Sequence, residues 1–166
     1  MDASRPSALD GATLDALMAV ALDEARAAAA HGDVPIGAVV ARVDDGTIIA
    51  RRHNERERLG DPTAHAEILA LRDAAASIGS WRLGGHVLIV TLEPCPMCAG
   101  AALAARVDTI AFGADDPKAG AVGSLYNFAA DPRLNHEAGV VAGIRAAEGG
   151  RLLRDFFAGR RDTRSR

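Results

Sequence analysis

Residues 86–92, HVLIVTL, form a continuous apolar run of strand length, and Pro94 follows soon after its end. An apolar run without polar alternation is typical of a central strand that is buried on both faces of a sheet. Residues 63–77 before the run have helical periodicity, and residues 96–106 after it, rich in Ala and Gly, are also predicted to be helical. A strand between two helices indicates a domain of the α/β class.

The first part of the chain adds a helix and a hairpin. Residues 13–30 repeat Leu, Met and Ala at three- and four-residue intervals, as an amphipathic helix does, and Gly32 is placed to end it. Two β-branched runs, residues 35–42 and 46–52, are joined by an Asp-Gly turn and therefore predict a β-hairpin. Residues 53–62 are polar and irregular, so we expect a loop there.

The last part of the chain completes the sheet. Residues 109–113 and 140–144 are predicted to be strands, and residues 145–159 a closing helix. A hairpin followed by alternating helices and strands predicts a three-layer α/β/α sandwich with a mixed central sheet of about five strands.

The length of 166 residues suits one domain with a sizeable core. We expect this domain over residues 13–161, between a flexible N-terminus at 1–12 and a flexible basic C-terminus at 162–166. The sequence shows neither a signal peptide nor an apolar stretch of membrane-spanning length, so we expect a cytoplasmic protein without membrane contact.

Charge gives only a local argument for nucleic acid. The net charge of −3 provides no global basic field of the kind that nucleic-acid binders usually have. Residues 151–166, however, hold six arginines against two aspartates. This end of the chain is either a solvated helix end, where basic residues offset the helix dipole, or a local RNA-binding patch.

The chain has only two cysteines, Cys95 and Cys98. Two cysteines cannot form a disulfide framework, and a bridge across so small a gap would stabilise little. In a cytosolic protein, a Cys-x-x-Cys pair indicates a thioredoxin-like redox pair or half of a zinc site. A zinc site would have to recruit a further ligand from the histidines.

His65 is the histidine best placed to do so. It lies at the start of a predicted helix, two residues before Glu67, and the Pro-Cys-x-x-Cys stretch begins 27 residues after that glutamate. The combined pattern is far more specific than either half. His65, Cys95 and Cys98 would give zinc three protein ligands and leave one position open for water, as in catalytic zinc sites.

Glu67 suits a role other than that of a ligand. Zinc lowers the pKa of a bound water toward about 7, and a nearby carboxylate can carry protons from that water to a substrate ring and to a leaving group. One geometric condition applies, because residues two apart on a regular helix point in roughly opposite directions. We therefore expect the pocket to lie across the mouth of the helix.

Longer stretches resemble a known family. They include DPTAHAEI at 61–68, VTLEPCPMCAGA at 90–101, KAGAVGSL at 118–125 and FFAGRR at 156–161. The first two resemble the cytidine deaminase superfamily of zinc hydrolases, and the last two its branch of bacterial tRNA-specific adenosine deaminases. The resemblance implies deamination of adenosine to inosine at wobble position 34 of a tRNA anticodon, with one Zn²⁺ per subunit and no organic cofactor.

The same resemblance implies roles for single residues, beginning with Glu67 as the catalytic proton shuttle of a His65, Cys95 and Cys98 zinc site. Asn54 matches a position that hydrogen-bonds the flipped base, although Asn is also common in turns. Asp116 matches an acidic residue near the ribose, and a turn aspartate before proline is the alternative. Further candidate RNA contacts are Lys118, His136, Phe156, Phe157, Arg160 and Arg161; the two phenylalanines have core packing of the last helix as an alternative role.

Other functions fit parts of the pattern. A deaminase of free guanine, cytosine or adenosine would use the same fold and zinc site. A zinc-stabilised RNA-binding or redox module would need no hydrolytic activity. Small residues after the zinc motif, at 100, 101, 104 and 105, either pack in the core or form the smooth surface of a homodimer, which is the usual assembly of the family.

Overall fold

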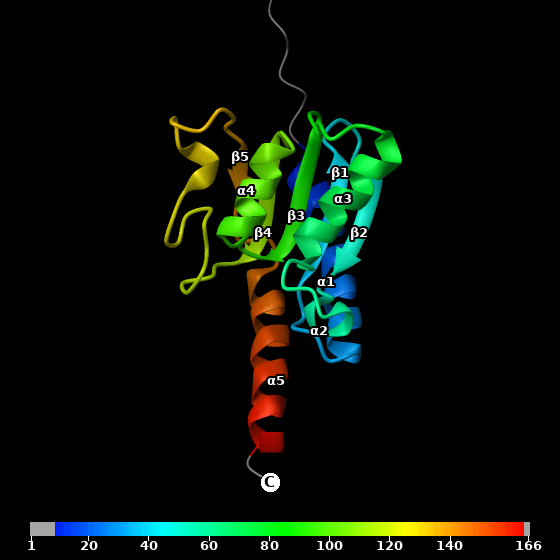
Figure 1. Cartoon of the computed structure of the whole chain (residues 1–166), viewed down its shortest axis with the longest axis vertical. Helices are drawn as coiled ribbons and strands as arrows, with labels where there is room; N and C mark the ends of the chain where they lie inside the picture. Colours follow the sequence, from blue (N-terminus) through cyan, green and yellow to red (C-terminus); the bar gives the residue numbers. More distant parts are fainter. Residues whose placement is uncertain (1–8, 165–166) are drawn as a thin grey trace, which may run out of the picture.

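Five strands form one mixed sheet in the order β2-β1-β3-β4-β5 in the computed structural model, which describes residues 9–164 (Figure 1). Strand β1 pairs antiparallel with both β2 and β3, whereas β3, β4 and β5 are parallel. The apolar run at 86–92 is the central strand, and both its faces are buried. The strands are β1 (Gly37–Arg42), β2 (Ile48–His53), β3 (His86–Leu92), β4 (Thr109–Ala114) and β5 (Gly139–Val141).

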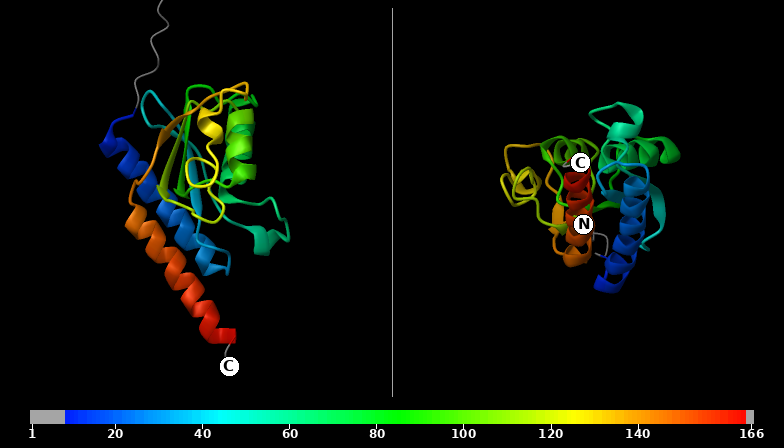
Figure 2. Two further views of the ribbon diagram at one scale, coloured as in Figure 1. Left: turned by 90° about the vertical axis from the view of Figure 1, so that its left-hand side faces the viewer. Right: turned by 90° about the horizontal axis from the view of Figure 1, so that it is seen from below.

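Helices cover both faces of this sheet. Figure 2 shows α1 (Gly11–Ala30) and α5 (Ala146–Arg164) together on one face, with α4 (Pro96–Ala104) on the other. Helix α3 (Ala66–Ile78) contacts α4 and the strands β1 and β2. The predicted three-layer sandwich is confirmed. Among residues 9–164, every helix is too short or too polar to traverse a bilayer.

The alternation of side chains along the strands divides the core in two. Val40 and Leu88 point into the cluster under α3 and α4, which includes Ala70 and Ala102. Their neighbours Val39 and Ile89 point to the opposite face and pack against α1. The many alanines on the helices let them lie close to the sheet. At Gly37 the backbone of α1 approaches so closely that an added Cβ would lie 2.7 Å from the amide nitrogen of Ala25.

Three details differ from the sequence-based expectation. The expected loop at 53–62 contains a short helix, α2 (Arg56–Leu59), because the carboxylate of Asp33 accepts hydrogen bonds from the backbone N–H groups of Glu57 and Arg58. A 3-10 turn, η1 (Phe128–Ala130), interrupts the long loop before β5.

The third difference concerns the ends of the chain. The closing helix continues to Arg164 rather than ending at 159, so the expected flexible C-terminus is helical as far as the structure describes it. Helix α1 begins at Gly11, inside the segment expected to be flexible. Residues 1–8 and 165–166 lie outside the described range.

Candidate active site

His65 is the residue that immediately precedes helix α3, not a residue within it. Its backbone is extended, with φ −72° and ψ 149°, and helical geometry starts at Ala66. The side chain of His65 makes no capping hydrogen bond within the described chain. His65 and Glu67 therefore do not share a regular helix, and the opposed directions expected for a two-residue helical spacing do not apply. This backbone geometry is compatible with the expected position of the site at the mouth of the helix.

Cys95 occupies the corresponding position before helix α4. It has φ −71° and ψ 172°, and Cys98 lies in the first turn. Helices α3 and α4 contact each other, and both begin at the end of the sheet where β3 stops (Figure 1). Two helix N-termini thus converge on the cysteines, and their dipoles favour thiolates there.

The three side chains fit a zinc ion. The Nδ1 atom of His65 lies 3.7 Å from Sγ of Cys95 and 3.4 Å from Sγ of Cys98. Zinc with ordinary Zn–N and Zn–S bond lengths and tetrahedral angles requires a separation of about 3.6 Å. The ligand atoms of all three residues lie within 4.8 Å of one another. The set has three members, which matches a catalytic site with one open position.

The electrostatics of the thiols suit metal binding. The hydrogen bond from the Cys98 thiol, helped by His65, lowers the pKa of Cys95 to about 4. The same contact raises the pKa of Cys98, because its proton is shared with the thiolate of Cys95. The Cys95 sulfur in turn raises the pKa of His65. A divalent cation would release these shared protons, as metal sites with cysteine ligands do.

Glu67 is a buried carboxyl group at this site. The residue is only 4% exposed, and its Oε2 atom has no hydrogen-bond partner among the described residues. Burial raises the pKa of Glu67 to about 7. A carboxyl group that titrates near neutral pH is matched to proton transfer in both directions. An unpartnered oxygen in the interior also needs a partner that a substrate or a water can supply.

Asn54 lies beside the zinc ligands. Its backbone N–H donates to the carbonyl of Ile36, and the N–H of the next residue donates to the carbonyl of Ala64, directly before His65. Asn54 is buried, and its Oδ1 atom has no partner among the described residues. A turn or capping role would have engaged this oxygen locally. The amide is thus available to an incoming polar group.

Sequence analysis missed Glu93, which organises the loop after β4. Its buried carboxylate accepts backbone hydrogen bonds from Asp116 (2.9 Å), Val122 (3.0 Å) and Ser124 (2.9 Å), and a further one from the Ser124 hydroxyl. Burial raises the pKa of Glu93, but these hydrogen bonds outweigh burial and bring it below its usual value. The signal in the sequence was an acidic residue directly after a buried strand.

The loop held by Glu93 carries two predicted substrate contacts. It lies at the zinc end of the sheet, since the N–H of Ala121 donates to the carbonyl of Pro94 (2.8 Å). The Oδ1 atom of Asp116 accepts from the N–H groups of Lys118 and Ala119, so this oxygen serves the turn. The side chain of Lys118 is exposed. The structure therefore supports the turn role of Asp116 and leaves its contact with a ribose untested.

Helix α5 projects past the sheet at the same end (Figure 1). Phe156 and Phe157 stack edge to face with centroids 5.4 Å apart, and Phe157 is 43% exposed. Among the described residues, neither phenylalanine belongs to a hydrophobic core cluster. The residue of α5 that packs against the core is Leu152. Arg160 lies over the ring of Phe156 and donates to the carbonyl of Gly32. Arg161 follows on the exposed last turns.

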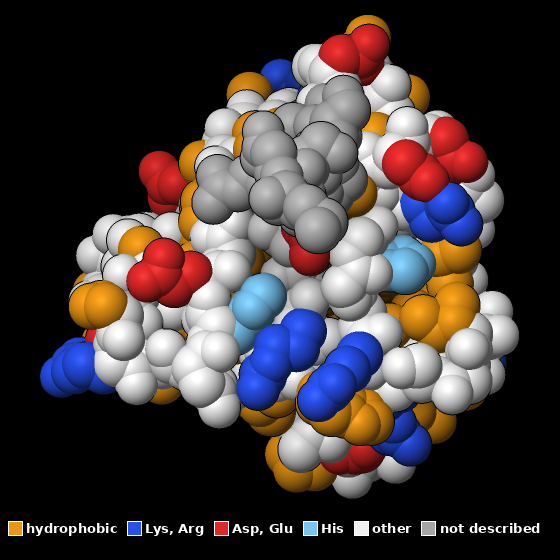
Figure 3. All heavy atoms as spheres, turned by 90° about the horizontal axis from the view of Figure 1, so that it is seen from above, with side chains coloured by type: hydrophobic (Ala, Val, Ile, Leu, Met, Phe, Trp, Pro, Cys, Tyr) orange, Lys and Arg blue, Asp and Glu red, His pale blue; other side chains and the backbone are white. Residues whose placement is uncertain are grey.

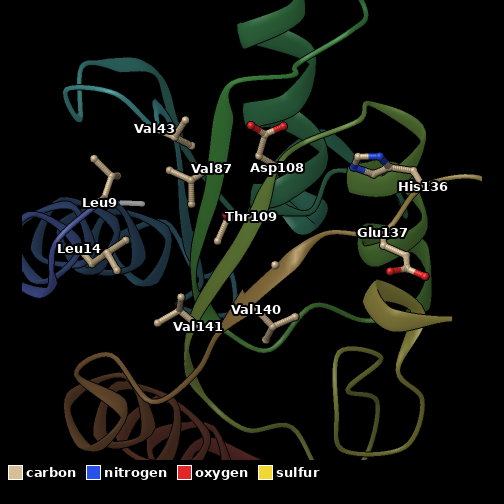
Figure 4. Close-up of a pocket in the computed structure, with 11 residues that line it drawn as sticks. Leu9, Leu14, Val43, Val87, Asp108, Thr109, His136, Glu137, Val140 and Val141 are labelled. Atoms are coloured by element: carbon tan, nitrogen blue, oxygen red, sulfur yellow. The ribbon is translucent and has the colours of Figure 1, made fainter. Parts of the chain in front are cut away.

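His136 is not brought to the zinc ligands. Its Nε2 atom lies 2.7 Å from the carbonyl oxygen of Val107, just before β4 begins. The strands separate this end of the sheet from the zinc end by about 20 Å. His136 instead lines another hollow of about 490 Å³ with Asp108 and Val140 (Figure 4). Acidic and basic side chains are interspersed on the visible surface at this end of the molecule (Figure 3).

Comparison with known proteins agrees with this geometry. Residues 12–114 match the model of the cytidine and deoxycytidylate deaminase zinc-binding region. The chain belongs to this deaminase family. The matched range includes all three residues of the His-Cys-Cys triad, and zinc is the cofactor of the deaminase.

Sequence and structure comparisons show which members of the family the deaminase is similar to. It is 50% identical over 140 residues to the tRNA-specific adenosine deaminase of Bacillus subtilis, covering 84% of this chain and 86% of the relative. A solved structure from a study of tRNA:A34 deaminases and A-to-I editing at the wobble position is 45% identical, with a TM-score of 0.79 over 83% of this chain and 99% of that one. A guanine deaminase from Nitrosomonas europaea is 27% identical, with a TM-score of 0.75 over 93% of this chain and 87% of that one.

Proposed function

We propose that this deaminase converts adenosine to inosine at the wobble position of a tRNA anticodon, with water as co-substrate and ammonia as the leaving group. The observation that carries the proposal is the convergence of His65, Cys95 and Cys98 beside the buried, unpartnered carboxyl of Glu67. Two relatives, 50% and 46% identical in sequence, are tRNA-specific adenosine deaminases, and they suggest tRNA as the class of substrate. A tRNA substrate is also consistent with the expected cytoplasmic location of the protein.

Zinc, when bound by the triad, supplies an activated water at neutral pH. The remaining chemistry is left to the protein's own groups, and Glu67 is the proton carrier. Its carboxylate accepts a proton from water at Oε2 and delivers it to the purine ring. It then takes the proton of the hydroxyl group added to the ring carbon and passes it to the amine, which leaves as ammonia while that carbon becomes a carbonyl. A pKa near 7 lets the same oxygen accept and release protons in one cycle.

Asn54 and the loop held by Glu93 position the substrate. The unpartnered Oδ1 of Asn54 accepts a hydrogen bond from a base that has left its stack and entered the pocket. Asp116 and Lys118 lie on the loop at the mouth of the site, where they meet the sugar and phosphate of the same nucleotide. The exposed Phe157, with Phe156 and the arginines of α5, meets neighbouring bases and phosphates.

The homodimer is part of the same proposal. Ala101 and Ala104 of α4, with Ala105 directly after it, line a hollow of about 310 Å³. Leu71 of α3 and Trp81, which is 56% exposed, line the same hollow. Small side chains beside an exposed tryptophan suit close packing against a second copy of the chain. Light scattering should give a dimer for the wild type and a monomer for an Ala104→Arg variant. A monomeric wild type at micromolar concentration would contradict this part.

Free nucleobases or nucleosides are the second candidate substrates, because the chain also shares its fold with a guanine deaminase. One assay separates the two. The purified protein is incubated with an anticodon hairpin that carries adenosine at the wobble position, and separately with free guanine, cytosine and adenosine. We expect inosine in the hairpin and no ammonia from the free compounds. Ammonia from a free base, without inosine in the hairpin, would reverse the assignment.

A further inference from the structure

We propose that His31, His53 and Glu55 form a second metal site, distinct from the His-Cys-Cys triad and suited to a divalent transition metal. The three residues come from the end of α1, the end of β2 and the position just before α2. One potential ligand atom from each lies within 4.8 Å of the others. The set contains two imidazoles and one carboxylate, and no sulfur.

His53 is held in the orientation that a ligand requires. Its Nδ1 atom lies 2.7 Å from Oε2 of Glu24, so Nδ1 donates to this carboxylate and Nε2 keeps its lone pair. The Nε2 atom is buried and has no hydrogen-bond partner among the described residues. A histidine that donates one N–H to a carboxylate and offers its other nitrogen is the usual arrangement at metal sites.

His31 also offers a ring nitrogen to a metal ion. Its Nδ1 atom lies 3.1 Å from Oδ2 of Asp33 but makes no hydrogen bond to it, and both Nδ1 and Nε2 are buried without a hydrogen-bond partner among residues 9–164. The ring centroids of His31 and His53 are 5.1 Å apart. Asp33 is 1% exposed, and its carboxylate lies against His31 and the backbone of α2. A cation nearby would compensate this buried charge.

Glu55 supplies the third ligand. Its Oε1 atom lies 4.0 Å from Nε2 of His53, and its Oε2 atom accepts from Arg52. Arg58 approaches Oε1 at 3.4 Å, but this side chain is 57% exposed. An ion pair with a solvent-exposed arginine is weak, so a metal ion can displace Arg58 from Oε1.

The donor set defines the class of ion. Two histidines and one carboxylate with open positions suit Zn²⁺, Co²⁺, Ni²⁺ or Fe²⁺, and they lack the thiolates that mark the first site. A bound ion would join the end of α1 to the segment that runs directly into Asn54. The second site therefore braces the substrate-binding side of the pocket without belonging to the reacting centre.

The test counts metal ions on the full chain without an affinity tag. Equilibrium dialysis against micromolar free Zn²⁺, followed by elemental analysis, should give two ions per chain for the wild type. His31→Ala and His53→Ala should each bind one, retained by the triad, which also shows that the variants are folded. His86→Ala is the matched control and should bind two, because the ring of His86 lies 3.0 Å from the carbonyl of Gly84 in its own turn and belongs to neither cluster of metal-ligating side chains among residues 9–164.

A subtler variant tests the orientation of His53. Glu24→Gln keeps all three ligands but weakens the hydrogen bond to Nδ1, and the second ion should bind about 10- to 100-fold more weakly while the first is unaffected. One ion per wild-type chain at saturating Zn²⁺ would overturn the proposal. Two ions in both histidine variants would overturn it as well.

Discussion

The carboxylate of Glu93 lies directly against the backbone at Gly120, in the space that a Cβ at that position would occupy. The carbonyl oxygen of Asp116 closes the same space and would be 2.6 Å from such a Cβ. The loop beside the zinc ligands can therefore close over the carboxylate only because residue 120 has no side chain. This contact fixes the positions of Asp116 and Lys118 relative to Cys95.

Gly120→Ala should push this loop away from Glu93. We expect a loss of about 1–3 kcal/mol in the free energy of unfolding, as for other overpacked sites, with a raised KM for the hairpin. Urea unfolding and steady-state kinetics measure the two effects. Gly84→Ala is the control, since a Cβ there meets nothing within 4 Å. Equal unfolding free energies for Gly120→Ala and Gly84→Ala would contradict the close packing of Glu93 against Gly120.

Glu93→Gln should loosen the loop without adding volume. The carboxylate now accepts hydrogen bonds from backbone N–H groups, and the amide nitrogen of glutamine would face the same donors without being able to accept from them. Each hydrogen-bonding group left unsatisfied lowers the free energy of unfolding by about 1–3 kcal/mol. We expect a higher KM for the anticodon hairpin and an unchanged zinc content. Glu137→Gln, at an exposed glutamate in the other hollow, should leave both values at wild-type level. An unchanged KM in Glu93→Gln would show that the loop does not contact the substrate.

Phe157→Ala should separate RNA binding from packing. Removal of one stacked base contact weakens binding by about 1–3 kcal/mol, which raises the Kd for the hairpin roughly 5- to 150-fold. The exposed ring contributes little to the core, so the unfolding free energy should stay near the wild-type value. Leu152→Ala should do the opposite, because Leu152 packs against the core. A destabilised Phe157→Ala with normal RNA affinity would favour the packing role.

The stability of the metal-free protein should depend on pH through Glu67. Burial raises the pKa of this group from 4.5 to about 7, so its contribution is fully present below pH 4.5 and is lost as pH rises through 7. Between pH 5 and pH 8, chelated wild type should therefore lose up to about 3 kcal/mol relative to chelated Glu67→Gln. Urea titrations of both proteins at the two pH values measure this difference. A pH-independent difference would mean that Glu67 is solvated.

Much of this molecule could be predicted from the sequence, because its signals are local. The apolar run at 86–92 is buried on both faces, and such a strand shows as an uninterrupted hydrophobic stretch. The triad was also predictable, since zinc ligand chemistry restricts the residue types and His65 lies in a motif that matches the only two cysteines of the sequence. The order of the main helices and strands is confirmed as well.

Non-local contacts explain what the sequence did not reveal. Helix α2 depends on Asp33, whose carboxylate accepts a hydrogen bond from the N–H group of Glu57. The two residues are 24 positions apart in the sequence. Glu93 organises its loop by accepting hydrogen bonds from N–H donors that lie 23 to 31 residues downstream. No sequence-spacing rule predicts these partners. His136 was a candidate RNA contact through the family resemblance, yet its ring lies against the carbonyl of Val107, just before β4 and away from the zinc end of the sheet. The extended backbone of His65, which frees it from the helical spacing relative to Glu67, is also a feature that only the structure supplies.

The most direct test of the account is inosine formation by Glu67→Gln in a wobble-adenosine hairpin, measured together with zinc at the triad. The variant keeps the size of the side chain and all three ligands but cannot carry a proton. We predict a rate at least 10²- to 10⁴-fold below that of the wild type, with the triad zinc retained and the fold unchanged. A variant that forms inosine at the wild-type rate with its zinc in place would contradict the assignment of Glu67 as the proton carrier.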